Sequence, residues 1–77
     1  MQIVHKGLLY DTDNSEEIFL DTRNGKERRY YRTKSKKYFA IYGNGEFAEK
    51  TESDVKDIIG SVSYNTYVKV FGKPEEA

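Results

Sequence analysis

The stretch from Glu27 to Gly45 constrains the fold more than any other part of the chain. It is dense in tyrosine, phenylalanine and isoleucine, which favour the pleated surface of a β-strand. We interpret it as two antiparallel strands, Glu27–Thr33 and Lys37–Gly43, joined by the turn Lys34–Lys36. The sequence therefore predicts a β-hairpin at the centre of the domain.

Asn-Gly dipeptides stand on both sides of this hairpin, at Asn24-Gly25 and Asn44-Gly45. An Asn-Gly pair tolerates the positive φ angles that a type I′ turn requires, so each dipeptide predicts a reversal of the chain. The first would pair strand Glu16–Thr22 with the central hairpin, and the second would add a short strand at Glu46–Lys50. Together these segments predict an antiparallel meander.

The N-terminal segment predicts one further strand, Ile3–Tyr10, which Gly7 interrupts and whose firmest part is Lys6–Tyr10. Residues 11–15 (Asp-Thr-Asp-Asn-Ser) then predict a turn, because these short polar side chains bond to nearby backbone. In the strand that follows, alternation predicts that Ile18 and Leu20 share one face.

Helix signals begin at Thr51, where Thr51 or Ser53 can cap the first turn. Four apolar side chains then recur at i, i+3, i+4 and i+7, namely those of Val55, Ile58, Ile59 and Val62. Gly60 either ends this helix or weakens it. The segment Ser63–Phe71 fits both the period of a strand and that of a helix.

The predicted fold class is α+β: a small single domain with a four- to five-stranded antiparallel β-meander packed by one or two short helices. We expect residues 1–72 to form the domain and residues 73–77 a loose tail. The predicted core is Leu8, Ile18, Leu20, Phe39, Ile41, Val55, Ile58, Ile59, Val68 and Phe71.

The 77 residues contain no cysteine, which excludes disulfides and thiolate metal sites and favours a reducing compartment. No apolar run approaches the roughly 20 residues of a membrane-spanning helix, and the first residues lack a signal-peptide core. We therefore expect a cytoplasmic protein without a membrane partner. An unpaired edge strand would permit a homodimer, and the sequence leaves monomer and homodimer open.

Thirteen basic and thirteen acidic residues cancel, but they are segregated along the chain. Acidic residues dominate residues 11–21 and 46–57, whereas residues 23–37 carry eight bases against one acid. The plain interpretation is that oppositely charged neighbouring strands pair across the sheet. The alternative is a surface that steers a charged partner.

Catalytic chemistry has little support in the sequence. The single histidine, His5, has no candidate nucleophile in a supporting motif. Oxygen ligands alternate from Asp11 to Glu17 as in a calcium loop, but Glu16 and Thr22 stand where an EF-hand needs glycine and glutamate. The G-x-G-x-x-A pattern that starts at Gly43 lacks the βαβ unit of a dinucleotide site. We expect no enzyme, no cofactor and no metal.

The basic, tyrosine-rich hairpin is the strongest candidate for a binding site. Arginine and lysine contact phosphates, and exposed tyrosines can stack on unpaired bases, which would suit a nucleic acid. Tyrosine and arginine also anchor protein interfaces, and the neutral net charge favours a protein partner. The predicted contact residues are Arg28, Arg29, Tyr31, Arg32, Lys34, Lys36 and Lys37.

Three blocks resemble a family of small proteins of bacteriophages and other mobile elements of Gram-positive bacteria. The blocks are Lys6-Gly7-Leu8-Leu9-Tyr10-Asp11-Thr12, Tyr31-Arg32-Thr33-Lys34 with Tyr38-Phe39, and Phe71-Gly72 with Glu75-Glu76-Ala77. The chain departs from the family where Asn14-Ser15-Glu16-Glu17 follows the first block and where Lys36 replaces the hairpin glycine.

The resemblance implies a helical closing element, which favours a helix at Ser63–Phe71. It also implies a non-enzymatic protein of the bacterial cytoplasm that binds a host protein or ribonucleoprotein complex. An inhibitor of a host defence complex, such as a CRISPR effector, is the expected function, and a small nucleic-acid-binding domain is the alternative.

Overall fold

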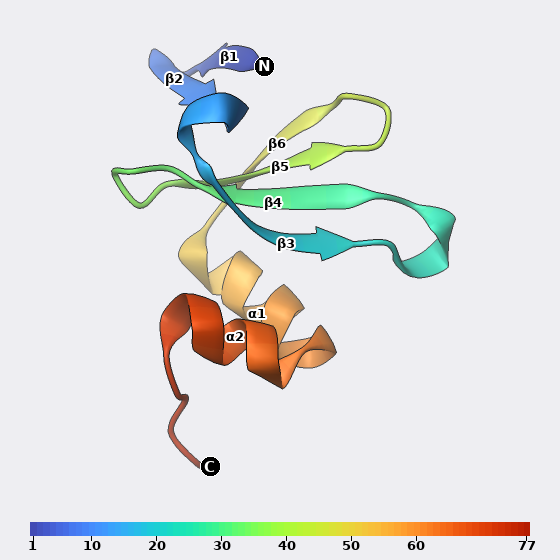
Figure 1. Ribbon diagram of the computed structural model, residues 1–77. Helices are drawn as coiled ribbons and strands as arrows, with labels where there is room; N and C mark the ends of the chain where they lie inside the picture. The colour runs from blue at the N-terminus through green and yellow to red at the C-terminus, as the bar shows by residue number, and fades with distance from the viewer.

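Six strands and two helices form three layers that follow one another along the chain (Figure 1). The computed structural model describes residues 1–77. A two-stranded hairpin lies on one face of a four-stranded sheet, and both helices lie on the other face (Figure 1). The elements are β1 (Gln2–His5), β2 (Leu8–Asp11), β3 (Glu16–Asp21), β4 (Arg28–Arg32), β5 (Tyr38–Tyr42), β6 (Phe47–Lys50), α1 (Glu52–Val62) and α2 (Tyr64–Phe71).

The four-stranded sheet has the order β3-β4-β5-β6, and every pair in it is antiparallel. This arrangement confirms the predicted meander and the α+β class. In the β3–β4 connection, Asn24 and Gly25 have φ angles of 61° and 69°, as a type I′ turn requires. In the β5–β6 loop only Gly45 has a positive φ, of 87°.

The N-terminal segment differs from the prediction of one strand over Ile3–Tyr10. Lys6 and Gly7 adopt φ angles of 51° and 78° and reverse the chain, so β1 and β2 pair with each other instead of joining the main sheet. The sequence does not indicate this turn, because a lysine rarely adopts a positive φ.

A β-bulge in β3 changes which of its side chains face the core. Glu17 lies opposite Tyr31 but Phe19 lies opposite Tyr30, so Ile18 is the additional residue. Ile18 and Phe19 both pack in the cluster between the sheet and the helices, whereas Leu20 is 40% exposed. The prediction that Ile18 and Leu20 share a buried face is therefore wrong.

Tyrosines make up much of the core, because the chain has few large aliphatic residues. On the helix side, Tyr30 and Tyr38 pack with Val55 and Ile59. On the hairpin side, a smaller cluster forms, made of Tyr10, Phe39 and Ile41. Of the predicted core, Ile18, Phe39, Ile41, Val55 and Ile59 are buried, Ile58, Val68 and Phe71 are half-buried, and Leu8 and Leu20 are exposed.

Both helices begin at a side-chain cap, and that of α1 is Thr51, one of the two predicted candidates. Asp54 N–H donates to Thr51 Oγ1 at 3.0 Å and Thr51 N–H to Asp54 Oδ2 at 3.2 Å, which is a capping box. Ser63 ends α1 and also caps α2, where the Thr66 N–H donates to its hydroxyl. The strand alternative for Ser63–Phe71 is thus wrong.

Gly60 does not end the helix. It lies inside α1 and faces the Tyr67 ring of α2, whose Cδ2 would lie 3.5 Å from an added Cβ. Neither helix has the length and apolarity that crossing a bilayer requires.

Candidate functional site

The predicted contact residues fall into two groups, those on strand β4 and those in the loop that follows it. On β4 the alternation of side chains directs Arg28, Tyr30 and Arg32 to the helix side of the sheet. Arg29 and Tyr31 face the opposite side, towards the β1–β2 hairpin. The strand residues and the loop residues have different surroundings.

Arg32 is a structural residue that joins three elements. Its Nη2 contacts Glu16 Oε1 of β3 at 2.8 Å, and its Nη1 donates to the carbonyl of Val70 in α2 at 3.0 Å. Its side chain is only 16% exposed. The carbonyls of the last turn of a helix lack partners within the helix, so Arg32 satisfies α2 there.

Arg29 is held between two carboxylates on the other face. Its Nε donates to Glu27 Oε1 at 2.8 Å, and its Nη1 lies 3.2 Å from Glu17 Oε1. The hydrogen bonds that Arg29 donates to Glu17 and then to Glu27 raise the pKa of its guanidinium. These pairs bear out the plain interpretation that the acidic and basic strands neutralise each other.

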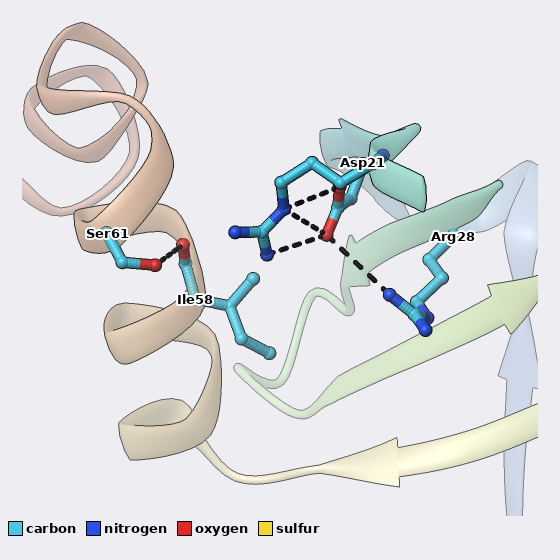
Figure 2. A network of polar contacts seen from close by, with 5 residues as sticks. Asp21, Arg28, Ile58 and Ser61 are labelled. Carbon is cyan, nitrogen blue, oxygen red and sulfur yellow. Dashed lines mark hydrogen bonds and ion pairs between the residues drawn. The ribbon is translucent and has the colours of Figure 1, made fainter. Parts of the chain in front are cut away.

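Arg28 belongs to a polar cluster around the buried carboxylate of Asp21 (Figure 2). The Arg23 guanidinium donates through Nε and Nη2 to the Asp21 carboxylate, and the Arg23 N–H donates to Asp21 Oδ1 at 3.0 Å. Arg28 Nη1 lies 3.9 Å from Asp21 Oδ2, and its guanidinium carbon lies 5.7 Å from the centre of the Tyr42 ring. The hydrogen bonds from Arg23 lower the pKa of Asp21 despite its burial.

Most of the tyrosine rings of the hairpin pack within the fold. Tyr30 and Tyr38 are buried, and burial raises the pKa of Tyr30. Tyr31, the one tyrosine among the predicted contact residues, is half-buried, and its ring stacks on Phe39 with 5.0 Å between the ring centres. The half-buried Tyr42 ring lies against the cationic groups of Arg28 and Lys50.

The loop Thr33–Lys37, the lysine loop, is different. Lys34, Lys36 and Lys37 are exposed, and none has an acidic side chain within 4.0 Å of its ammonium. Thr33 N–H donates to the Lys37 carbonyl at 2.8 Å and Lys36 N–H to the Thr33 carbonyl at 3.0 Å. Lys36 has a φ of 66°, in the left-handed region. A closed, hydrogen-bonded loop thus presents three uncompensated charges.

The lysine loop is the charged counterpart of an ordinary turn in the same sheet. The β5–β6 loop repeats its hydrogen bonds, since Tyr42 N–H donates to the Glu46 carbonyl at 2.9 Å and Gly45 N–H to the Tyr42 carbonyl at 2.8 Å. Its left-handed position is held by Gly45, the usual residue for that conformation. In the lysine loop the same position carries a lysine instead.

A second cluster, which no motif in the sequence predicts, fixes the N-terminal hairpin to the sheet. The Tyr10 hydroxyl donates to Glu49 Oε2 of β6 at 3.3 Å, and His5 Nε2 and Lys6 Nζ each lie 3.6 Å from Glu49 Oε1. Desolvation by itself raises the pKa of Glu49, but the neighbouring Lys6, His5 and Tyr10 outweigh it, and the pKa is lowered. Glu49 thereby joins β6 to both strands of the hairpin.

The alternating oxygen-bearing residues that start at Asp11 form a turn in the structure. Asp11 Oδ1 accepts from the Asp13 N–H at 3.0 Å, and the Ser15 hydroxyl donates to the Asp11 carbonyl at 2.7 Å, as in a turn. No three histidine, aspartate or glutamate side chains gather as ligands for one ion.

Comparison with protein-family models, curated proteins and solved structures finds no match to this chain.

Proposed function

We propose that this chain is a non-enzymatic binding protein that docks on an acidic surface of a protein partner through the lysine loop. The observation that carries the proposal is the contrast between β4 and the loop. The arginines of β4 are each paired with carboxylates of the same chain, whereas Lys34, Lys36 and Lys37 have no acidic partner. Uncompensated charge on a closed loop can meet a partner with little loss of conformational entropy.

The left-handed lysine supports the same proposal. A non-glycine residue in this region costs of the order of 1 kcal/mol, and such strain is concentrated at functional sites. The turn at Gly45 is the unstrained solution to the same geometry. A lysine at position 36 therefore favours a role for its charge.

The resemblance to small proteins of phages and mobile elements directs the choice of partner. It supports a host protein or ribonucleoprotein complex as the target, with a CRISPR effector among the candidates. Inhibition would then result from covering a surface of that complex. Nucleic acid is the second candidate, because the three lysines could also contact phosphates. It is the weaker one, since the tyrosines that would stack on bases lie in the core.

The test uses two variants with the same change in net charge. In the first, Lys34, Lys36 and Lys37 are each replaced with glutamate. In the control, three other lysines without acidic partners are replaced, namely Lys26, Lys69 and Lys73. Purified wild-type protein and both variants are added to the DNA-cleavage reaction of host CRISPR effectors, and binding is measured by surface plasmon resonance.

We expect the wild type and the control to bind and inhibit, and the loop variant to lose both activities. Equal behaviour of the two variants would contradict the role of the lysine loop. A parallel titration with labelled DNA and RNA at two salt concentrations tests the alternative. Binding that falls log-linearly with salt and is lost only in the loop variant would assign the loop to nucleic acid.

A further inference from the structure

The outer face of the N-terminal hairpin carries an exposed apolar pair. Val4 and Leu9 lie directly opposite each other in β1 and β2, and they are 73% and 58% exposed. Leu8 is also exposed, but alternation along β2 places it on the face of Tyr10 and not on that of Leu9. The hairpin does not need these side chains for its own packing, because Ile3 and Tyr10 on its inner face contact the core and Glu49 fixes its end.

The apolar pair and the lysine loop belong to one side of the molecule. A shallow depression is lined by Leu9 together with Thr33, Lys34 and Ser35, so the end of the loop lies beside β2. Figure 1 shows the loop, in green, projecting from the end of the sheet nearest β2. Exposed apolar side chains beside charged ones are typical of a docking surface.

The depression has one acidic side chain, that of Asp11, which accepts hydrogen bonds from the Asp13 N–H at 3.0 Å and from Gln2 Nε2 at 3.3 Å. The ammonium groups of Lys34, Lys36 and Lys37 have no carboxylate within 4.0 Å. The lysine loop contains these three lysines and no acidic residue, so the complement of the loop is an acidic surface.

We propose that Val4 and Leu9 are the apolar half of a docking surface whose charged half is the lysine loop. The occupant is an acidic protein segment that also presents an aliphatic or aromatic side chain. This inference rests on the proposed function, and it specifies what the partner offers: carboxylates for the lysines and an apolar side chain for the Val4–Leu9 pair.

The probes are three synthetic peptides of equal length. The first is rich in glutamate with interspersed leucine and phenylalanine, the second replaces those apolar residues with serine, and the third replaces glutamate with lysine. Each is titrated into the ¹⁵N-labelled protein and followed by NMR chemical shifts. We expect the acidic apolar peptide to bind most tightly and to shift the amides of Val4, Leu9 and the lysine loop together.

The double variant Val4→Ser/Leu9→Ser should bind that peptide about tenfold more weakly, because two partly buried aliphatic contacts are lost. It should bind the serine-containing acidic peptide as the wild type does. The matched control is Leu20→Ser/Val62→Ser, which removes two other exposed aliphatic side chains, each 40% exposed. Thermal unfolding verifies that both variants fold.

Two outcomes would refute the role of the Val4–Leu9 pair without affecting the role proposed for the lysine loop. One is equal binding of the two acidic peptides, and the other is an unchanged affinity of Val4→Ser/Leu9→Ser for the first peptide. Failure of every acidic peptide to bind at low salt would overturn the lysine loop as well. Concentration-dependent dimerisation of the free protein that Val4→Ser/Leu9→Ser abolishes would assign the pair to a second copy of this chain and overturn the acidic partner.

Discussion

Replacing Lys36 with glycine should stabilise the protein. Lys36 is exposed and adopts a φ of 66°, and the equivalent position of the β5–β6 loop is occupied by Gly45 with a φ of 87°. The left-handed conformation costs an L-residue roughly 1–2 kcal/mol, whereas glycine adopts it freely. Glycine also has more unfolded-state entropy to lose, worth about 0.4–1 kcal/mol. The net gain is therefore about 0.5–1 kcal/mol.

Equilibrium unfolding in urea measures this difference, and for a domain of this size the gain corresponds to a rise of about 2–8 °C in Tm. Two controls accompany the variant. Lys36→Ala removes the charge but keeps the strained backbone, so its stability should match that of the wild type. Gly45→Ala imposes the strain on the other loop and should cost about 0.5–1 kcal/mol, because an added Cβ there has no atom within 4 Å to contact.

Equal stability of Lys36→Gly and Lys36→Ala would refute the argument, since the two differ only in backbone freedom. If the lysine loop binds an acidic partner, Lys36→Gly should also bind it more weakly while being more stable. A more stable and less active variant is the expected sign of strain retained for function.

Four further substitutions test the helix packing and the ion pairs. Arg23→Ala should lower the Tm more than Asp21→Asn, whose cost is about 1 kcal/mol, because only the first leaves a buried carboxylate without its main partner. Folding lowers the pKa of Asp21, so the ion pair stabilises the wild type above the unfolded pKa of about 3.9. This stabilisation is lost as the pH falls through the folded pKa of Asp21. The Tm of Arg23→Ala should therefore depend less on pH in the acid range than that of the wild type. Glu49→Gln should increase hydrogen exchange in β1 and β2 while β4 and β5 stay protected, and equal protection throughout would exclude the anchoring role. Gly60→Ala should stabilise α1 by about 0.5–1 kcal/mol, because alanine has a higher helix propensity than glycine. The added Cβ would meet the Tyr67 ring at 3.5 Å, which is an ordinary van der Waals contact. A lower Tm would show that the two helices cannot accommodate the methyl group.

The elements that the sequence predicts correctly are those whose signals are local. Asn24-Gly25 sets its turn through backbone preference, and Thr51 with Asp54 sets the start of α1 through a capping box. The meander follows from such turns, because strands joined by tight turns are neighbours. The closing helix was ambiguous in its periodicity, and Ser63 decides it by capping α2.

The errors occur where a tertiary contact or an unusual backbone angle overrides a local pattern. The bulge at Ile18 shifts the alternation of β3, so Leu20 is exposed although its spacing indicates burial. Lys6 adopts a left-handed angle that its residue type disfavours, and the N-terminal segment becomes a separate hairpin.

The candidate site was predictable only in part. Charge density in residues 23–37 indicated the correct region, but it gave no information on which charges are neutralised within the fold. That depends on the register between β3 and β4, which places Glu16 opposite Arg32 and brings Glu17 close to Arg29. Register is a property of paired strands and has no local signature.

The topology also has a consequence for how this chain folds. Each strand of the main sheet pairs with its neighbour in the sequence, β1 pairs with β2, and α1 packs on α2 across the single residue Ser63. Short separations between paired segments keep the entropy of loop closure small. Chains in which such local pairings dominate fold quickly, and they spend little time with unpaired strand edges exposed to other molecules. We therefore expect this small protein to aggregate little through open strand edges while it folds.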